Sequence, residues 1–238
     1  MRQVVFDLET TGFRFDEGHR VVEIGGVELV RGALTGRTFH TYVNPERDMP
    51  EGAFKVHGLS ETFLKGFPVF ADRKVSRAFV DFVGDAELIA HNGVSFDVPF
   101  INAELAGVGM AALTNSIIDT LHLARRKFPG SPASLDALCS RFGVDTSRRE
   151  RDGHGALLDS RLLAQVYIEL TGGLQAGLDF AVEGPTAAER QETKVRGARV
   201  RPHAIGRLLT KDEAAAHSTF VEKELGPANL WARHQAQS

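Results

Sequence analysis

Two carboxylates near the N-terminus, Asp7 and Glu9, are the first residues whose types and spacing could support chemistry. They follow an apolar run at residues 4–6, whose β-branched and aromatic side chains predict a buried strand. Residues two apart on a strand project from the same side, so the two acids would lie together. Like charges on a buried strand are unfavourable unless a cation neutralises them. The pair alone fits a metal site and equally fits a strand end whose acids face water.

Two further acids and a histidine stand at the starts of predicted helices. Asp97 lies in the first turn of a helix, after His91 and Asn92. Asp159 lies in the second turn of a later helix, and His154 stands just before that helix. An acid at a helix start is commonly a cap, and a histidine there is commonly a surface or capping residue. His91 and Asn92 fit a structural role and a role at the substrate equally, so none of these residues is decisive alone.

The elements that must position these residues alternate between strands and helices, which predicts an α/β fold. Three strands come first and are expected to pair antiparallel, with a hairpin connection at residues 31–36. The predicted strands cover residues 4–12, 21–30, 38–43, 88–90 and 117–118. The predicted helices cover residues 72–83, 95–105, 121–127, 134–142 and 155–170. Residues 44–59 and 143–153 are expected to be loops, and the lone Cys139 is expected to lie in the core.

Composition separates the chain of 238 residues into a domain and an appendage. Residues 1–180 carry 24 acids against 19 basic residues, which argues against binding a long duplex by charge alone. Residues 181–204 lack apolar periodicity and predict a flexible linker. The basic run at 190–207 fits a solvated linker or weak contact with DNA or a partner. Residues 208–238 regain apolar side chains but are too short for their own core, so we expect them to fold on a partner.

The chain holds no apolar run near the ~18 residues that a membrane helix needs, so no membrane association is expected. It begins with a strand and lacks the basic start and apolar stretch of a signal peptide. We therefore expect a cytoplasmic protein.

Taken together, the motifs resemble the DEDD superfamily of 3′–5′ exonucleases. D-x-E at residues 7–9, N-x3-F-D at residues 92–97 and H-x4-D at residues 154–159 occur in the family's order. The histidine five residues before the last acid is similar to the His-bearing branch. The resemblance implies a ribonuclease H-like mixed sheet flanked by helices, here followed by a flexible C-terminal tail.

A closer resemblance covers residues 2–180, and the C-terminal tail resembles the same proteins. The segments concerned are similar to the proofreading epsilon subunits of bacterial DNA polymerase III; they lie at residues 6–12, 56–58, 125–130, 134–139 and 154–159. This resemblance implies removal of mispaired nucleotides from a DNA 3′ end, single-stranded or frayed, with release of nucleoside 5′-monophosphates. Residues 208–238 resemble the segment by which such subunits bind the polymerase alpha subunit.

The resemblance also implies roles for individual residues. Two divalent ions, Mg²⁺ or Mn²⁺, would be bridged by Asp7. Glu9 and Asp159 would complete one ion's site and Asp97 would hold the other. His154 would be the general base, because an imidazole titrates near neutrality. The implied substrate-binding residues are Asp7, Glu9, His57 and Asp159. The family's usual acid shortly before His57 is displaced by one position here, to Glu51, because Gly52 intrudes.

The segment after the predicted domain resembles a short peptide that docks into sliding clamps. Gln175, Leu178 and Phe180 match its Q-x-x-L-x-F pattern, although a helix end covering the domain would also fit. The expected organisation is an exonuclease domain at 1–173, a linker at 174–207 containing this peptide at 175–180, and a polymerase-binding segment at 208–238.

Two other functions fit part of the pattern. A free-standing exonuclease that trims RNA or single-stranded DNA ends would share the acids and the histidine but would not need the tail. An inactive scaffold joining polymerase and clamp would need the tail but would have no use for buried acids. The complete set of acids together with the tail favours the proofreading subunit.

Overall fold

A computed structural model describes residues 1–172 and 210–225. The chain divides into two units, 1–180 and 181–238, and each is described by itself. The clamp-like residues Gln175, Leu178 and Phe180 and the basic run at 190–207 lie outside the described residues. The organisation expected beyond residue 173 therefore stays a prediction.

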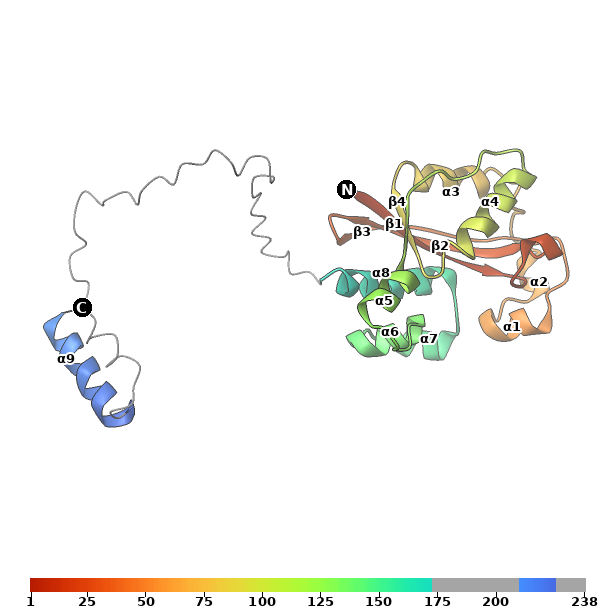
Figure 1. Ribbon diagram of the computed structural model, residues 1–238. Coiled ribbons are helices and arrows are strands. Elements are labelled where there is room, and N and C mark those ends of the chain that lie inside the picture. Colours follow the sequence, from red (N-terminus) through yellow and green to blue (C-terminus); the bar gives the residue numbers. More distant parts are fainter. Residues whose placement is uncertain (173–209, 226–238) are drawn as a thin grey trace, which may run out of the picture. The chain divides into compact units, whose positions relative to one another are not determined.

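The first unit is built on a five-stranded mixed sheet with the order β3-β2-β1-β4-β5 (Figure 1). The strands are β1 (Arg2–Thr10), β2 (Val21–Val30), β3 (Ala33–Tyr42), β4 (Glu87–Ala90) and β5 (Ile117–Asp119). β1, β2 and β3 pair antiparallel, whereas β4 pairs parallel with β1 and β5 parallel with β4. The prediction of three antiparallel strands in an α/β fold is confirmed.

Alternation along β1 sends its side chains to two different layers. Val4, Phe6 and Leu8 pack in one core beneath α3 (Ser76–Val83) and α4 (Asp97–Gly107). Val5 points to the opposite face, where it packs with residues of α8 (Ala156–Leu170). Figure 1 shows these helices on opposite sides of the sheet. Asp7 and Glu9 lie two and four residues after Val5, so their side chains project from the same face of the sheet, toward α8.

Several predicted boundaries were wrong. The remaining helices are η1 (Phe15–Glu17), α1 (Glu51–His57), α2 (Glu61–Leu64), α5 (Thr120–Lys127), α6 (Leu135–Phe142) and α7 (Ser147–Asp152). The expected loops at 44–59 and 143–153 therefore contain α1 and α7. These helices are short and bury almost no apolar stripe, so they lack the periodicity that predicts a helix. The third strand begins at Ala33 rather than at the predicted residue 38. Its first half was missed because this edge strand is exposed there and shows no alternation of buried and exposed residues.

A close approach between β2 and the start of α8 fixes the position of that helix. Gly25 lies directly opposite Asp7 in the sheet. A Cβ at Gly25 would lie 2.1–2.3 Å from backbone atoms of Ala156 and Leu157. The Ser160 hydroxyl donates to the Gly25 carbonyl at 3.0 Å, which ties the same two elements together. The missing side chain at Gly25 thus lets α8 bring its first turns against the acids of β1.

The second unit contributes one described helix. α9 (Lys211–Phe220) begins with a capping box: Thr210 Oγ1 accepts from the Glu213 backbone N–H, and Glu213 Oε2 accepts from the Thr210 N–H at 2.8 Å. A short π-helical turn, η3 (Val221–Leu225), follows it. The side chains of α9 are exposed throughout, including Phe220. Within the described residues, every helix is too short or too polar to cross a membrane.

Replacing Gly25 with alanine is expected to destabilise the protein and displace α8. The added methyl group would overlap backbone rather than a flexible side chain, and forced overpacking of this kind costs about 1–3 kcal/mol. Urea unfolding followed by circular dichroism measures the loss. Gly107→Ala is the matched control, because a Cβ there meets nothing within 4 Å and alanine favours a helix. Equal stability of the two variants would contradict the assigned role of Gly25.

Candidate active site

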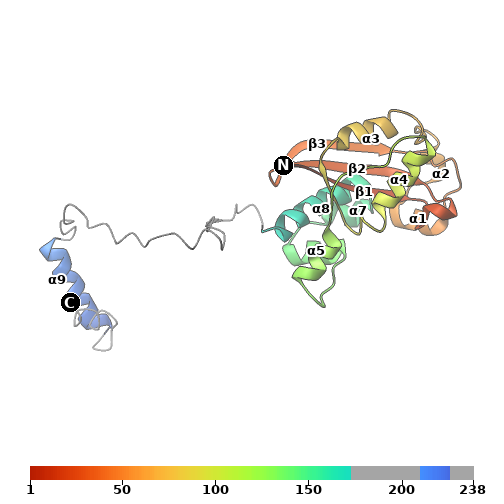
Figure 2. The ribbon, with the colours of Figure 1, turned by 45° about the horizontal axis from the view of Figure 1, so that its top comes forward.

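Three separate elements deliver the predicted acids to one place. Asp7 and Glu9 lie at the end of β1, Asp97 begins α4, and Asp159 lies in the first turns of α8. Figure 2 shows α8 running along the sheet, with its first turns at the end where β1 finishes. Ligand atoms of Glu9, His154 and Asp159 lie within 4.8 Å of one another. The structure thus brings together residues that are up to 150 positions apart in the chain.

Asp97 reaches the cluster from the opposite face of the sheet. β1 continues beyond Val5, its last residue paired with β4, and in this open stretch the Leu8 backbone is close enough to the Asp97 carboxylate to lower its pKa. Among the charges near Asp7, that of Asp97 has the largest effect on its pKa. Among those near Glu9, Asp159 has the largest effect. The four acids therefore lie close enough to affect one another's ionisation.

Burial raises the pKa of every acid in the cluster, and repulsion from the other cluster acids raises those of Asp7 and Glu9 further. Burial is the larger cause in each case, because a carboxylate loses its hydration there. The pKa of Glu9 rises to about 8 and that of Asp97 to about 7. The pKa of Asp7 is well above its ordinary value, and that of Asp159 is raised. At neutral pH, ionisation of these carboxyl groups therefore costs the folded protein free energy.

The cluster fits a divalent cation. Among the described residues, Asp97 Oδ1 and Asp159 Oδ1 are buried without a hydrogen-bond donor. Leaving a buried acceptor unpaired is costly, and a metal ion would satisfy both atoms. The donors are carboxylate oxygens and one imidazole nitrogen, which suit a hard ion such as Mg²⁺ or Mn²⁺. The residues present thus have the chemistry of a metal site.

An arginine that the sequence analysis did not single out contacts this cluster. Arg149 lies in α7, and its Nη2 donates to His154 Nδ1 at 2.7 Å and to Asp159 Oδ2 at 2.9 Å. Its Nε approaches Asp159 Oδ1 at 2.8 Å without the alignment of a hydrogen bond. Nothing in the sequence indicated this residue, because the segment was expected to be a loop rather than a helix beside α8.

A second residue that the sequence analysis missed supports the loop before Asp97. Asp119 accepts hydrogen bonds from the backbone N–H groups of Asn92 and Val94 at 3.2 and 3.3 Å, and it also caps α5. Asn92 has a φ of 65°, which the loop requires for its turn. His91 Nδ1 lies 2.9 Å from Thr120 Oγ1. In this structure His91 and Asn92 serve the geometry of the loop.

His57 lies beside a groove next to the acids. Its Nδ1 accepts the Leu59 N–H at 3.0 Å, and burial lowers its pKa, so the neutral ring carries its hydrogen on Nε2. This Nε2 is buried and has no acceptor among the described residues. The groove has a volume of about 580 Å³, and Glu9, Phe13, Val56 and Phe96 are among its lining residues.

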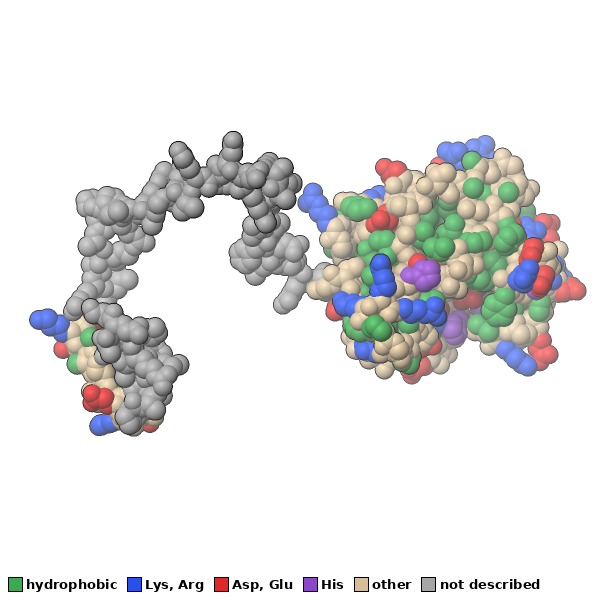
Figure 3. All heavy atoms as spheres, viewed as in Figure 1, with side chains coloured by type: hydrophobic (Ala, Val, Ile, Leu, Met, Phe, Trp, Pro, Cys, Tyr) green, Lys and Arg blue, Asp and Glu red, His purple; other side chains and the backbone are tan. Residues whose placement is uncertain are grey.

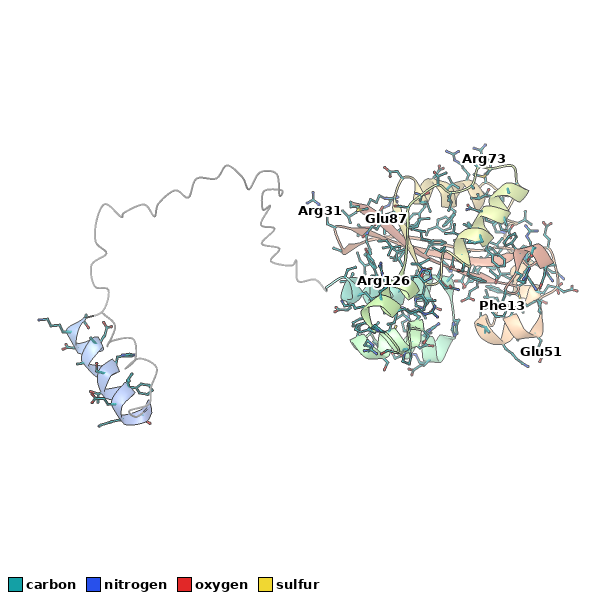
Figure 4. The ribbon with its side chains drawn as sticks, in the orientation of Figure 1. Phe13, Arg31, Glu51, Arg73, Glu87 and Arg126 are labelled. Atoms are coloured by element: carbon teal, nitrogen blue, oxygen red, sulfur yellow. The ribbon has the colours of Figure 1, made fainter. Side chains whose placement is uncertain are left out.

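The outer rim of this groove is apolar. Figure 4 labels Phe13, which lies beside α1 and is 85% exposed. Figure 3 shows hydrophobic side chains exposed beside α1 and basic side chains over α5, where Arg125, Arg126 and Lys127 follow one another.

Glu51 points outward from α1, is paired with Lys55 at 2.6 Å and is not among the groove residues.

Comparison with solved structures shows the class of fold. Exonuclease I superposes with a TM-score of 0.62 at 16% identity, over 71% of this chain and 40% of that one. Exonuclease X in complex with 5′-overhanging duplex DNA superposes with a TM-score of 0.55 at 23% identity, over 71% of this chain and 90% of that one. The architecture is thus the ribonuclease H-like fold of these exonucleases, as the sequence predicted.

Sequence comparison shows the family. The family model described as Exonuclease (RNase T) matches residues 4–167, and the chain belongs to this family. DNA polymerase III subunit epsilon of Rickettsia felis is 44% identical over 239 residues, covering 96% of this chain and 99% of that protein. The subunits of the same name from Salmonella typhimurium and Escherichia coli K12 are 41% and 40% identical, each covering 97% of both chains.

The raised pKa values of Glu9 and Asp97 predict how the stability of the metal-free protein changes with pH. Between the ordinary carboxyl values and about 7 to 8, the folded chain binds more protons than the unfolded chain. The free energy of unfolding is therefore expected to fall as the pH rises through this window. In EDTA, the melting temperature should drop by several degrees from about pH 5.5 to about pH 8.5.

The double variant Glu9→Gln, Asp97→Asn is the control for this measurement. Its amides cannot titrate, so the decline with pH should flatten in the variant. A melting temperature of the natural protein that rises over the same range would show that the acids are not held in a repulsive cluster.

Proposed function

We infer that this chain is a metal-dependent 3′–5′ exonuclease that removes mispaired terminal nucleotides as the proofreading subunit of a replicative DNA polymerase. The observation that carries this inference is the convergence of Glu9, His154 and Asp159, with Asp7 and Asp97 close enough to affect their neighbours' ionisation, within an exonuclease-family domain. Similarity to DNA polymerase III subunit epsilon over nearly the full length supports the replicative setting. A DNA 3′ terminus is the proposed substrate.

We propose that two ions, Mg²⁺ or Mn²⁺, bind among the four acids. Asp7 would contact both ions, Glu9 and Asp159 would hold one, and Asp97 would hold the other. Such ions activate a water molecule and stabilise the charge on the leaving oxygen. Asp97 Oδ1 supports this assignment, because it is buried without a hydrogen-bond donor; Asp159 Oδ1 also lacks a hydrogen bond and has only the Arg149 Nε as a charged neighbour at 2.8 Å.

His154 would take the proton from the attacking water. Its side chain is 41% exposed and lies 3.3 Å from Asp159 Oδ2, so it can reach both solvent and the cluster. A positioned imidazole contributes on the order of 10²–10⁴-fold as a general base. The resulting products would be nucleoside 5′-monophosphates.

The groove beside the acids would hold the terminal nucleotide. The neutral His57 can donate its Nε2–H to a substrate oxygen without adding charge. Phe13, Val56 and Phe96 offer apolar surface on which an unpaired base can stack. A frayed, mispaired end would enter this groove more readily than a paired end, because its base is already unstacked.

Asp7→Asn and Glu9→Gln are each expected to lower the rate of 3′-nucleotide removal by at least about a hundredfold. That is the order of loss when one transition-state contact is removed, and the amides cannot replace a carboxylate that binds a cation. Digestion of a DNA primer with a mispaired 3′ end, with Mg²⁺ or Mn²⁺, measures the rate. Asp81→Asn is the control, because Asp81 lies exposed on α3 and pairs only with Arg77 among the described residues.

The same assay separates the alternative functions. A free-standing enzyme that trims RNA would digest an RNA primer faster than DNA and would ignore mispairing. An inactive scaffold would leave every primer intact, and activity retained by both acid variants would overturn the site assignment.

We propose that residues 208–238 bind the polymerase alpha subunit and that residues 175–180 bind the sliding clamp. The Salmonella typhimurium relative matches 97% of this chain, and α9 exposes all of its side chains, as a helix that binds a partner would. The Q-x-x-L-x-F pattern at Gln175, Leu178 and Phe180 supports clamp docking through one amide and two apolar anchors.

Two variants test these partners against each other. Truncation after residue 207 should end co-purification with the polymerase subunit and leave clamp binding intact. Gln175→Ala with Phe180→Ala should weaken clamp binding at least about tenfold, as loss of anchor residues does, and leave the polymerase complex intact. Digestion of single-stranded DNA should be normal in both variants. An unchanged clamp titration would overturn the peptide assignment, and retained polymerase binding would overturn that of the tail.

A further inference from the structure

Arg149 holds its guanidinium against the acid cluster. The side chain is 10% exposed, and it contacts Asp159 through two nitrogens and His154 through one. Its remaining terminal nitrogen, Nη1, pairs with Asp136 of α6. Figures 1 and 2 both show α7, which carries Arg149, at the end of α8 where the helix begins. One arginine thus joins the cluster to a neighbouring helix.

The guanidinium acts on the same acids that a metal ion would bind. Its positive charge lowers the pKa of Asp7, Glu9 and Asp159, against the effects of burial and of the neighbouring acids. An arginine stays protonated at any pH the protein experiences, so this charge is permanent. A cation only a few ångströms from a divalent ion would be strongly repelled. Arg149 in this position and an ion between Glu9 and Asp159 therefore exclude each other.

We propose that Arg149 is a built-in competitor of the metal ion between Glu9 and Asp159, and that ion binding displaces its guanidinium. This rests on the proposed metal site. In the metal-free protein the arginine neutralises acids that would otherwise repel one another. The binding of an ion must first overcome this internal ion pair, so the arginine lowers the affinity for metal.

A cavity beside α7 provides the place for the displaced side chain. It has a volume of about 540 Å³, and Arg149 lines it together with Asp136, Ser140, Thr146, Glu150 and His154. Asp136 already binds Nη1, so the guanidinium can turn away from Asp159 without losing this contact. Glu150 in the same cavity offers a second carboxylate. We expect the movement to be a rotation of the Arg149 side chain into this cavity.

The test is direct measurement of Mn²⁺ binding to the full-length protein without DNA, by calorimetry or electron paramagnetic resonance. Arg149→Gln removes the charge at similar length and is expected to tighten Mn²⁺ binding roughly tenfold, within the usual range of coupling between two ligands. Arg149→Lys keeps the positive charge but has only one donor nitrogen. The Mn²⁺ affinity of this variant should therefore lie between those of the natural protein and of Arg149→Gln. Arg148→Gln is the matched control, because Arg148 is exposed on the same helix.

Thermal unfolding provides a second readout independent of activity. In EDTA, Arg149→Gln should melt below the natural protein, because the acids lose their internal counter-charge. Saturating Mn²⁺ should raise its melting temperature by more than it raises that of the natural protein, because tighter binding stabilises the folded state more.

The outcomes separate this proposal from the proposed function. Unchanged or weaker Mn²⁺ binding in Arg149→Gln overturns the competitor role and leaves the metal site standing. Unchanged binding together with a raised KM for DNA would show that Arg149 contacts the substrate instead, which also overturns it. Absence of Mn²⁺ binding in the natural protein would refute the metal site itself, and the competitor role with it.

Discussion

Repulsion among four carboxylates is the constraint on which the rest of this structure depends. Asp7, Glu9, Asp97 and Asp159 come from both faces of one sheet and meet in a region with little water. Burial and like charge both oppose their ionisation, so the chain must supply compensating free energy elsewhere. A site under such strain is commonly functional, because the stored repulsion becomes affinity for a cation.

The compensating free energy comes from two apolar layers packed on the sheet. One face of β1 packs with the aromatic residues of α3 and α4. On the other face Val5 packs against α8, and the acids Asp7 and Glu9 follow it along the strand. Gly25 lets α8 approach closely, and Asp119 holds the loop that leads to Asp97. The positions of the acids are thus determined by backbone packing and buried hydrogen bonds rather than by their own interactions, which are repulsive.

We propose that the first unit carries the exonuclease reaction and that the segments at 175–180 and 208–238 bind the partner proteins. The exonuclease-family match ends at residue 167, whereas the similarity to epsilon subunits continues through the tail. Tethering an exonuclease to its polymerase raises the effective concentration of the primer end without any new contact at the active site. Such an arrangement would let a groove with limited electrostatic attraction for DNA act on the correct terminus.

The sequence alone determined the fold class and the antiparallel pairing of the first three strands, and it predicted the acids that the structure brings together. The apolar run in β1 and the residues that flank Asp97, His154 and Asp159 are local signals, which can be read without knowledge of the fold. It also predicted the buried Cys139, which the structure confirms. The short helices α1 and α7 were missed because each buries too little apolar surface to create a period.

Only the tertiary structure decided which residues surround the acids. Arg149 and Asp119 reach the site or its supporting loop through contacts between elements, and neither contact leaves a trace in local spacing. Gly25 is an ordinary strand glycine in the sequence, and its importance follows from the helix packed on it. The pKa values of Glu9 and Asp97 likewise depend on burial and on neighbours distant in the chain. Sequence periodicity reports which face a residue occupies, whereas charge and packing act across space between segments that only the fold brings together.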